Sequence, residues 1–428
     1  MTANTIFKNH KKQIFPNVPE VFTDGFPKNY RPWIDGWAFS EEQLKSKLSD
    51  GTYKLLTLDV SISPDDYVKE VNSGPREEIS QRAEEKYQCE IGCRHCFECK
   101  TDTNNPLMNF GELKEIMHKA EQLGLESIKF LGPGELLHNP ELFKILDYFE
   151  NEKIKVGIFT KGVILGDDEL ARKLFSMPAK DFCKKLCNYS CVCLLVGLTS
   201  ADPETEDQRL QTSIKNFSAK RNRGLENAAR LGMNSDPACQ RLALICAPVL
   251  LDNIDEAFEI FQWGVKRNIP VVLAPTMVSG KGLDMAEINN DNFKSHDLVN
   301  LYVDAYSWLI EQGIMTPNQI EKEGVSPYAG IICNQFISGM FIRKDGRIQA
   351  CPGNESVAFR YCQDIRHDDL KNVWTRSLGY ALRKELVETG RMTLTQPCYA
   401  KTEGRLVPKG SIAEDFYQLV MAKIKSGR

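Results

Sequence analysis

Short apolar runs alternate with amphipathic segments along most of the first 280 residues. The runs are rich in leucine and β-branched residues, and they predict strands at 54–62, 127–131, 155–160, 191–198, 241–250 and 271–275. Between them the hydrophobic periodicity predicts helices at 111–123, 140–149, 168–175, 205–231 and 254–267. Near-continuous apolar strands separated by amphipathic helices are typical of a parallel sheet covered by helices, so the pattern predicts an α/β fold.

The alternation stops after residue 282. A helix at 297–312 is followed by a predicted hairpin at 340–351, which turns at Asp345-Gly346, and by a helix entry at 364–374. The first 50 residues are proline-rich and irregular. We therefore divide the chain into an N-terminal extension, a repeating α/β region, a helical linker and a small α+β domain, at 1–50, 51–282, 283–330 and 331–428.

Composition narrows the choice of partners. The formal net charge of −4 gives no general attraction to nucleic acid or to a membrane surface. No signal peptide is recognisable at the N-terminus. The longest apolar run, 242–251, is about half of a membrane span. We therefore expect a cytoplasmic protein that binds neither nucleic acid nor membrane.

The fourteen cysteines are clustered, and in a large chain without a signal peptide they indicate metal or redox chemistry. Cys89, Cys93 and Cys96 are spaced by four and then three residues, with Gly92 between them. One short loop can turn three such thiols toward three corners of an iron–sulfur cube, which leaves the fourth iron without a protein ligand. The alternatives are a zinc site and three unrelated buried thiols.

This C-x3-C-x2-C spacing resembles the signature of the radical SAM superfamily, although His95 stands where that family usually has an aromatic residue. The resemblance implies a [4Fe-4S] cluster whose open iron chelates S-adenosylmethionine (SAM). Reductive cleavage of SAM would then give methionine and a 5′-deoxyadenosyl radical, chemistry that proteins delegate to cofactors. It also implies a partial (β/α)6 TIM-like barrel for residues 51–282.

Further motifs follow three of the predicted strands, where barrels of this kind carry their working residues. Gly132, Gly134 and Glu135 resemble the family's GGE motif, whose backbone and acid groups receive the SAM ammonium. Thr160 ends the third strand in a Thr-Lys-Gly sequence that resembles the Thr-Asn-Gly of relatives. Thr199 and Ser200 end the fourth, where relatives contact the SAM ribose, although such residues also commonly cap helices.

The C-terminal region resembles the auxiliary-cluster extension called SPASM or twitch, which opens with a cysteine, a spacer, a glycine, four residues and a second cysteine. Here these are Cys333, Gly346 and Cys351. The resemblance implies one auxiliary iron–sulfur cluster with Cys398 as third ligand. Cys362 is a possible fourth ligand, and substrate or water could take that place instead. A zinc site in a small hairpin domain is the alternative.

Together these resemblances imply a radical SAM enzyme, an oxidoreductase or a related catalyst acting on an unactivated C–H bond. We expect a small-molecule substrate such as a sugar or aminocyclitol, an auxiliary cluster that oxidises or positions it, and flavodoxin or ferredoxin as reductant. No catalytic side chain is assigned. One alternative is a peptide- or protein-modifying enzyme similar to maturases of ribosomal peptides or sulfatases. Another, of a different class, is a non-catalytic iron–sulfur or zinc-binding interaction protein.

Overall fold

The fold is taken from a computed structural model of the whole chain. The residues it describes are 15–28, 30–32, 34, 36–37, 39, 43–44, 48–49, 52–85, 89, 91–93, 95–96, 105–132, 134–249, 253–274, 280–281, 295–323, 335–352, 360–377 and 421–426. Within them, no helix has the length and apolar character needed to cross a membrane.

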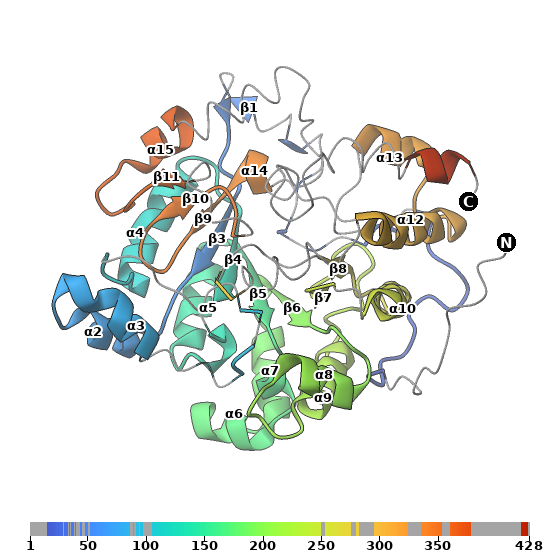
Figure 1. The fold of residues 1–428 in the computed structure, drawn as a ribbon, viewed down its shortest axis with the longest axis horizontal. Helices are drawn as coiled ribbons and strands as arrows, with labels where there is room; N and C mark the ends of the chain where they lie inside the picture. Colours follow the sequence, from blue (N-terminus) through green and yellow to red (C-terminus); the bar gives the residue numbers. More distant parts are fainter. Residues whose placement is uncertain are drawn as a thin grey trace.

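One curved sheet organises the molecule (Figure 1). Its hydrogen-bonded order is β11-β10-β9-β3-β4-β5-β6-β7-β8. Neighbours from β9 through β3 to β8 are parallel, and β10 and β11 are antiparallel additions. The strands are β3 (Thr57–Ser61), β4 (Ser127–Gly132), β5 (Lys155–Thr160), β6 (Val192–Gly197), β7 (Leu242–Cys246), β8 (Val271–Leu273), β9 (Gly339–Ile342), β10 (Ile348–Gln349) and β11 (Arg360–Cys362).

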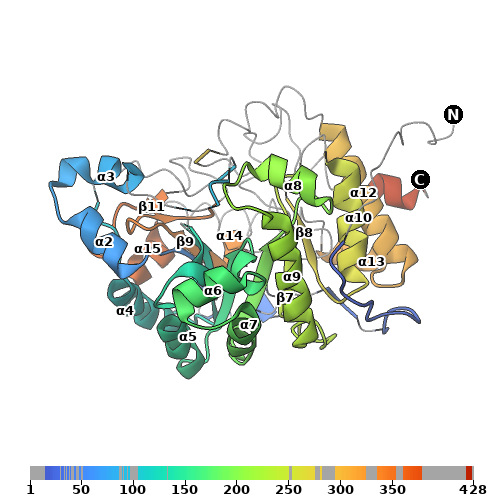
Figure 2. The same cartoon turned by 90° about the horizontal axis from the view of Figure 1, so that it is seen from below.

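Helices cover the outer face of this sheet (Figure 2). The connections carry α2 (Asp65–Asn72), α3 (Ile79–Glu85), α4 (Phe110–Glu121), α5 (Leu142–Asn151), α6 (Asp168–Phe175), α7 (Ala179–Cys187), α8 (Pro203–Leu210), α9 (Phe217–Arg230) and α10 (Ile254–Val265). Further along are α12 (Ser295–Glu311), α13 (Pro317–Glu323), α14 (Gln335–Ser338) and α15 (Leu370–Arg376). Three 3-10 turns, η1 (Arg76–Glu78), η2 (Leu136–His138) and η3 (Val163–Leu165), and the small pair β1 (Leu48–Ser49) and β2 (Thr52–Tyr53) complete the elements.

Alternate strand residues separate two buried layers. On β6, Leu194 and Val196 join the large core beneath the helices, whereas Cys193 and Leu195 join a smaller cluster on the inner face. Trp37 of the N-terminal extension packs into this inner cluster, with its ring centroid 5.0 Å from that of Phe159. Because both faces are buried, the strands read as continuous apolar runs rather than as alternating patterns.

The α/β prediction is confirmed, and the six predicted strands correspond to β3–β8. Closure as a partial barrel stays a prediction, as do the domain boundaries. The predicted helical region 205–231 is divided in two: α8 ends at Leu210 and α9 begins at Phe217. The residues that cap these ends, Gln211 and Asn216, both have left-handed backbone. The Asp207 side chain joins the two helices, accepting a hydrogen bond from the Ser218 hydroxyl at 2.5 Å.

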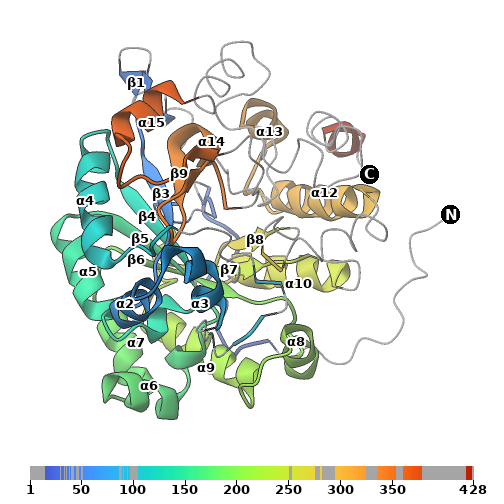
Figure 3. The ribbon, with the colours of Figure 1, turned by 60° about the vertical axis from the view of Figure 1, so that its left-hand side comes forward.

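The hairpin predicted near the C-terminus is present, but its position was not anticipated. β9 and β10 pair antiparallel, and Gly346 turns between them with a φ of 79°. β9 also pairs in parallel with β3, so that Leu58 lies opposite Met340. The C-terminal segment therefore extends the central sheet, and α15 packs beside α4 (Figure 3).

Ile34 of the N-terminal extension lies at the opposite end of the sheet from the motif-bearing loops. Ile34 forms a bridge with Gln240, just before β7. A cavity of about 500 Å³ opens here, lined by Phe39 of the extension and by residues that precede β4 and β5. It is therefore separate from the ends where Glu135 and Thr160 lie.

Glu150, near the end of α5, accepts hydrogen bonds from the residues just before β6. We expect its contribution to the free energy of unfolding to depend on pH. Burial raises its pKa, but hydrogen bonds from Cys191 and Ser190 outweigh burial and lower it from 4.5 to about 2. A carboxylate whose pKa is lower in the folded state than in the unfolded state stabilises the fold at any pH above its unfolded-state pKa. This contribution is lost as the pH falls through its folded-state pKa. Glu150→Gln should therefore lower the free energy of unfolding by an amount that is constant above pH 4.5 and shrinks toward pH 2.

Urea unfolding at a series of pH values measures this difference. Glu152→Gln, at an exposed position directly after the same helix, is the control and should change the free energy of unfolding by less than about 0.5 kcal/mol. An equal effect of Glu150→Gln at pH 2 and pH 6 would contradict the assignment.

Candidate active site

The cysteine loop lies between α3 and α4 and reaches the carboxyl-end edge of the sheet. Cys89, Cys93 and Cys96 are all half-buried, and the Cys96 amide donates to the Cys93 carbonyl at 3.2 Å. The Lys281 amide, which follows β8, donates to the Cys96 carbonyl at 2.9 Å. The loop is therefore held against a segment that comes from the far side of the sheet.

Gly132 ends β4 at this same edge, and Gly134 and Glu135 come shortly after it; these residues are named the 132–135 loop. Gly134 has a φ of +75°, which favours glycine, and an added Cβ would meet no heavy atom within 4 Å. Glu135 accepts hydrogen bonds from the Thr160 hydroxyl at 2.5 Å and from the Lys161 amide at 2.7 Å. These bonds join the ends of β4 and β5.

Electrostatics links the cysteine loop to the 132–135 loop. Burial raises the pKa of the Cys93 thiol; Lys161 opposes this rise, whereas Cys89 and Glu135 add to it. Burial likewise raises the pKa of Glu135, against the effects of His138, Thr160 and Lys161. Such mutual influence requires proximity. The structure therefore brings together Cys93, Cys89, Glu135 and Thr160, which the sequence had assigned to one site.

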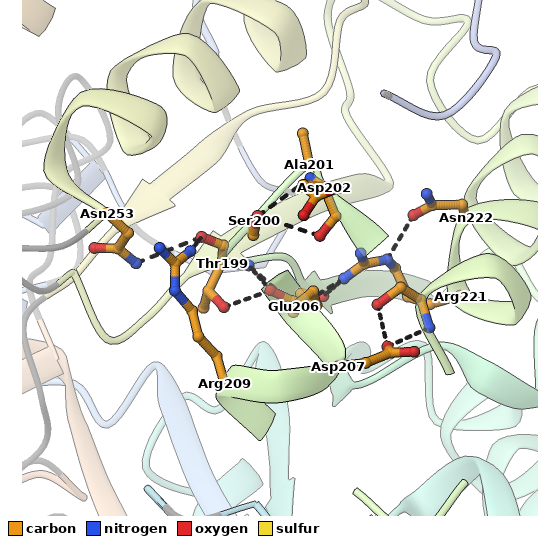
Figure 4. A network of polar contacts seen from close by, with 12 residues as sticks. Thr199, Ser200, Ala201, Asp202, Glu206, Asp207, Arg209, Arg221, Asn222 and Asn253 are labelled. Carbon is orange, nitrogen blue, oxygen red and sulfur yellow. Dashed lines mark hydrogen bonds and ion pairs between the residues drawn. The ribbon is translucent and has the colours of Figure 1, made fainter. Parts of the chain in front are cut away.

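Thr199 and Ser200 lie at the end of β6 inside a polar network (Figure 4). The Thr199 hydroxyl donates to Glu206 at 2.5 Å, and the Ser200 hydroxyl donates to Glu256 at 2.6 Å. Both residues are buried. Each hydroxyl has one hydrogen, and that hydrogen is already donated to a carboxylate. Toward any further group, each hydroxyl oxygen can therefore act only as a hydrogen-bond acceptor.

Sequence reasoning missed the charged members of this network. Glu206 pairs with Arg221 at 3.0 Å, and neither side chain is exposed to solvent. Arg221 also donates to the Gly197 carbonyl at 2.8 Å, and Arg209 pairs with Glu256 at 3.0 Å. Helices α8, α9 and α10 are thus joined to the end of β6 through one fully buried ion pair and one partly buried ion pair.

The inner face of β3 and β4 is polar, which the sequence reasoning also missed. Lys129 lies 2.8 Å from Asp59 and donates to Gln335 of α14 at 2.7 Å, entirely within the fold. The hydroxyls of Thr57, Ser61, Ser63 and Ser127 and the amide of Gln349 are buried, without a hydrogen-bond partner within the part of the chain that the structure describes. Folded proteins pair nearly all buried polar groups, so these side chains favour an ordered water or a polar ligand as partner.

The C-terminal cysteines are only partly described. Cys333 and Cys398 lie outside the described residues. Cys351 follows β10 and is half-buried, whereas Cys362 on β11 lies opposite Ile348 and packs against the outer core. Burial and the Asp368 carboxylate, to which the thiol donates, raise the pKa of Cys362 to about 12.

The residues at the cysteine loop fit an iron–sulfur cluster in their donor type and in the space around them. Gly92 has a φ of +62°, and an added Cβ there would again meet no heavy atom within 4 Å. Among the described side chains, no three of His, Cys, Asp or Glu converge as ligands of one metal ion. A cube-type cluster does not require that convergence, because each thiolate binds a different iron.

No protein-family model matches the chain, and no curated protein matches it. Among solved structures, the chain is similar to Streptococcus suis SuiB bound to S-adenosylmethionine, with a TM-score of 0.49 and 15% identity over 87% of this chain and 78% of that one. A second structure of Streptococcus suis SuiB gives a TM-score of 0.46 and 16% identity over 87% and 79% of the two chains.

Proposed function

We propose that this chain is a radical SAM enzyme in which Cys89, Cys93 and Cys96 hold a [4Fe-4S] cluster. The meeting of the cysteine loop with the 132–135 loop carries the proposal, since Cys93 lies within electrostatic reach of both Cys89 and Glu135. When bound, the cluster and SAM would supply reductive cleavage to a 5′-deoxyadenosyl radical that abstracts hydrogen from the substrate.

In this proposal Glu135 receives the ammonium group of SAM. Burial penalises the negative charge of Glu135, and a ligand cation would offset that penalty. Thr160 and the Lys161 amide fix the orientation of the carboxylate. Gly134 leaves the approach to the backbone clear, and Gly132, which ends β4, has the positive φ of +146° that favours glycine.

Thr199 and Ser200 would contact the ribose only as acceptors, since their hydroxyl protons are donated to Glu206 and Glu256. A ribose hydroxyl can donate to such an acceptor. We propose that the network mainly fixes the position of this loop. Glu206 and Glu256 are then positioning residues.

We propose a polar small molecule as substrate, such as a sugar or aminocyclitol, and an electron donor such as flavodoxin or ferredoxin. The buried hydroxyls and the Gln349 amide on the inner sheet face support a polar ligand. The two charged side chains on this face, Lys129 and Asp59, form an ion pair, so the face carries no net charge from them. Transfer of deuterium from a labelled candidate into 5′-deoxyadenosine would identify the substrate, and transfer from a peptide alone would favour the maturase alternative.

We further propose that Cys333, Cys351 and Cys398 hold one auxiliary iron–sulfur cluster. Cys351 supports this as a half-buried thiol at the end of the hairpin strand. Cys362 would need to release its hydrogen bond to Asp368 and lose its proton before it could act as a fourth ligand.

Substitution of a cysteine in the loop tests the proposal directly. Anaerobically reconstituted protein with reductant and SAM should form 5′-deoxyadenosine, and Cys93→Ser should abolish that product because one corner of the cluster loses its thiolate. Liquid chromatography of the nucleosides and iron analysis provide the two measurements.

Cys239→Ser is the matched control, since Cys239 is half-buried just before β7, away from the motif-bearing loops. It should keep wild-type iron content and SAM cleavage. Stoichiometric zinc in place of iron, or cleavage retained by Cys93→Ser, would overturn the proposal and favour the interaction-protein alternative.

A further inference from the structure

The N-terminal extension enters the space enclosed by the curved sheet at the amino ends of its strands. Gly36 has a φ of +70°, and an added Cβ there would lie 2.7 Å from the Lys155 Cβ and 3.2 Å from the Ser127 Cβ. These two residues begin β5 and β4. The turn at Gly36 therefore fits directly against the first residues of both strands, and it can do so because glycine has no side chain.

This turn carries Trp37 onto the inner face of the sheet. Trp37 is 8% exposed and belongs to the inner cluster with Leu195 and Ala243. Its ring centroid lies 5.0 Å from that of Phe159, and the Lys129 ammonium lies 4.8 Å from the indole centroid. A cation over an aromatic face is attracted to it. Trp37 is therefore held against side chains of both β4 and β5.

The Gly36–Trp37 turn has space on two sides. Phe159 and Ile245 belong to the inner face and are half-buried, whereas Ile158, on the outer face, is fully buried. A partly exposed apolar side chain on the inner face requires space within the curve of the sheet. On the other side of the turn, Gly36 lines the cavity of about 500 Å³. The turn therefore separates this cavity from the space above Phe159.

We propose that Trp37 closes the amino end of the space in which the substrate is bound, and that its indole sets the depth of that space. The inference rests on the proposed function. A 5′-deoxyadenosyl radical can take hydrogen from any C–H group that reaches it, so a closed site prevents reaction with solutes. The floor also limits the substrate to a molecule, or to a part of one, that fits above the indole. Trp37 is thus a specificity-determining residue that the N-terminal extension supplies.

A deuterated solute measures whether the floor is closed. The probe is 2-propanol deuterated on carbon, added with reductant and SAM but without substrate. Where the alcohol reaches the radical, one deuterium atom moves from its central carbon to C5′, which yields deuterated 5′-deoxyadenosine and leaves a carbon radical on the alcohol. Mass spectrometry of the nucleoside measures the deuterated fraction. Trp37→Ala should raise this fraction severalfold over wild type, because removal of the indole joins the cavity to the space above Phe159.

Trp308→Ala is the matched control. Trp308 of α12 is also 8% exposed, but it packs in the outer core, with its ring centroid 5.9 Å from that of Phe261. Both substitutions should lower the melting temperature, since each leaves a cavity in a packed cluster. Only Trp37→Ala should raise the deuterated fraction. Trp37→Leu, a milder change, should raise it by a smaller factor and provides the test if the alanine variant does not fold.

Indole supplies an independent measurement. An apolar cavity created by a substitution can bind a small apolar molecule. Added indole should therefore raise the melting temperature of Trp37→Ala and return its deuterated fraction toward the wild-type value. The same concentration of indole should leave the deuterated fraction of Trp308→Ala unchanged.

The possible outcomes separate the two proposals. Wild-type protein that forms no 5′-deoxyadenosine would overturn the proposed function and this inference with it. Cleavage of SAM with the same deuterated fraction in wild type and in both Trp37 variants would overturn this inference alone. An equal rise in Trp37→Ala and Trp308→Ala would assign the effect to a general loosening of the fold, which also contradicts a floor at Trp37.

Discussion

Replacing Arg221 with methionine is expected to lower the free energy of unfolding by about 3–5 kcal/mol, the usual result of removing one partner from a buried ion pair. Glu206 would be left as a fully buried carboxylate without its cation. The hydrogen bond from Arg221 to the Gly197 carbonyl would be lost as well. Chemical denaturation of the purified variant measures the effect.

The same helix supplies a matched control. Arg230 pairs with Glu226 at 3.3 Å, but its side chain is 63% exposed. Arg230→Met should therefore cost less than about 1 kcal/mol. The double variant Arg221→Met/Glu206→Gln should be more stable than the two single changes predict by addition, because no uncompensated charge remains. Equal effects of Arg221→Met and Arg230→Met would contradict the importance of burial.

Gly224→Ala is expected to destabilise the protein by about 1–3 kcal/mol or more, although alanine is the better helix former. Helix propensity alone would add about 0.5–1 kcal/mol of stability. However, the new Cβ would lie 2.6 Å from the Gly162 carbonyl oxygen and 2.8 Å from the Leu165 Cβ. Since a backbone carbonyl cannot rotate away, α9 would have to move off the turn that follows β5.

Helix propensity predicts that Gly224→Ala raises the free energy of unfolding, whereas the steric clash predicts that it lowers it. Urea unfolding measures the sign of this change. The control is Arg223→Ala, whose position next to Gly224 is exposed and which keeps its Cβ. Its effect should stay within about 0.5 kcal/mol. A stabilising Gly224→Ala would show that α9 and this turn are not in close contact.

The strands were predictable because burial on both faces leaves a continuous apolar run in the sequence. β4, β5 and β6 are examples, and their residues are buried except for Gly132 of β4 and Lys155 and Phe159 of β5, which are half-buried. Pairing between distant strands leaves no such local signal. Nothing in the sequence Gly-Met-Phe-Ile of β9 indicates that β3 is its neighbour, although Gly339 pairs with Thr57 far earlier in the chain.

The site was predictable to the extent that its residues lie at or just after the ends of strands. Thr160 is the last residue of β5 and Glu135 lies three residues after β4, and the parallel pairing of these strands brings the two together. The burial of Arg221 was not predicted, because the sequence of α9 is rich in polar residues and is typical of a helix exposed to solvent. The buried residues Phe217, Leu225 and Ala228 share the helix face of Arg221, and this spacing was the available signal that its guanidinium points inward.

The parallel pairing of β9 with β3 also determines how the two halves of the chain can be studied. A fragment that stopped before residue 339 would expose the backbone donors and acceptors of β3, which β9 now engages. Such a bare strand edge invites self-association. The contribution of the C-terminal cysteines should therefore be dissected by single substitutions in the intact chain, since a truncated protein would report on aggregation rather than on cluster chemistry.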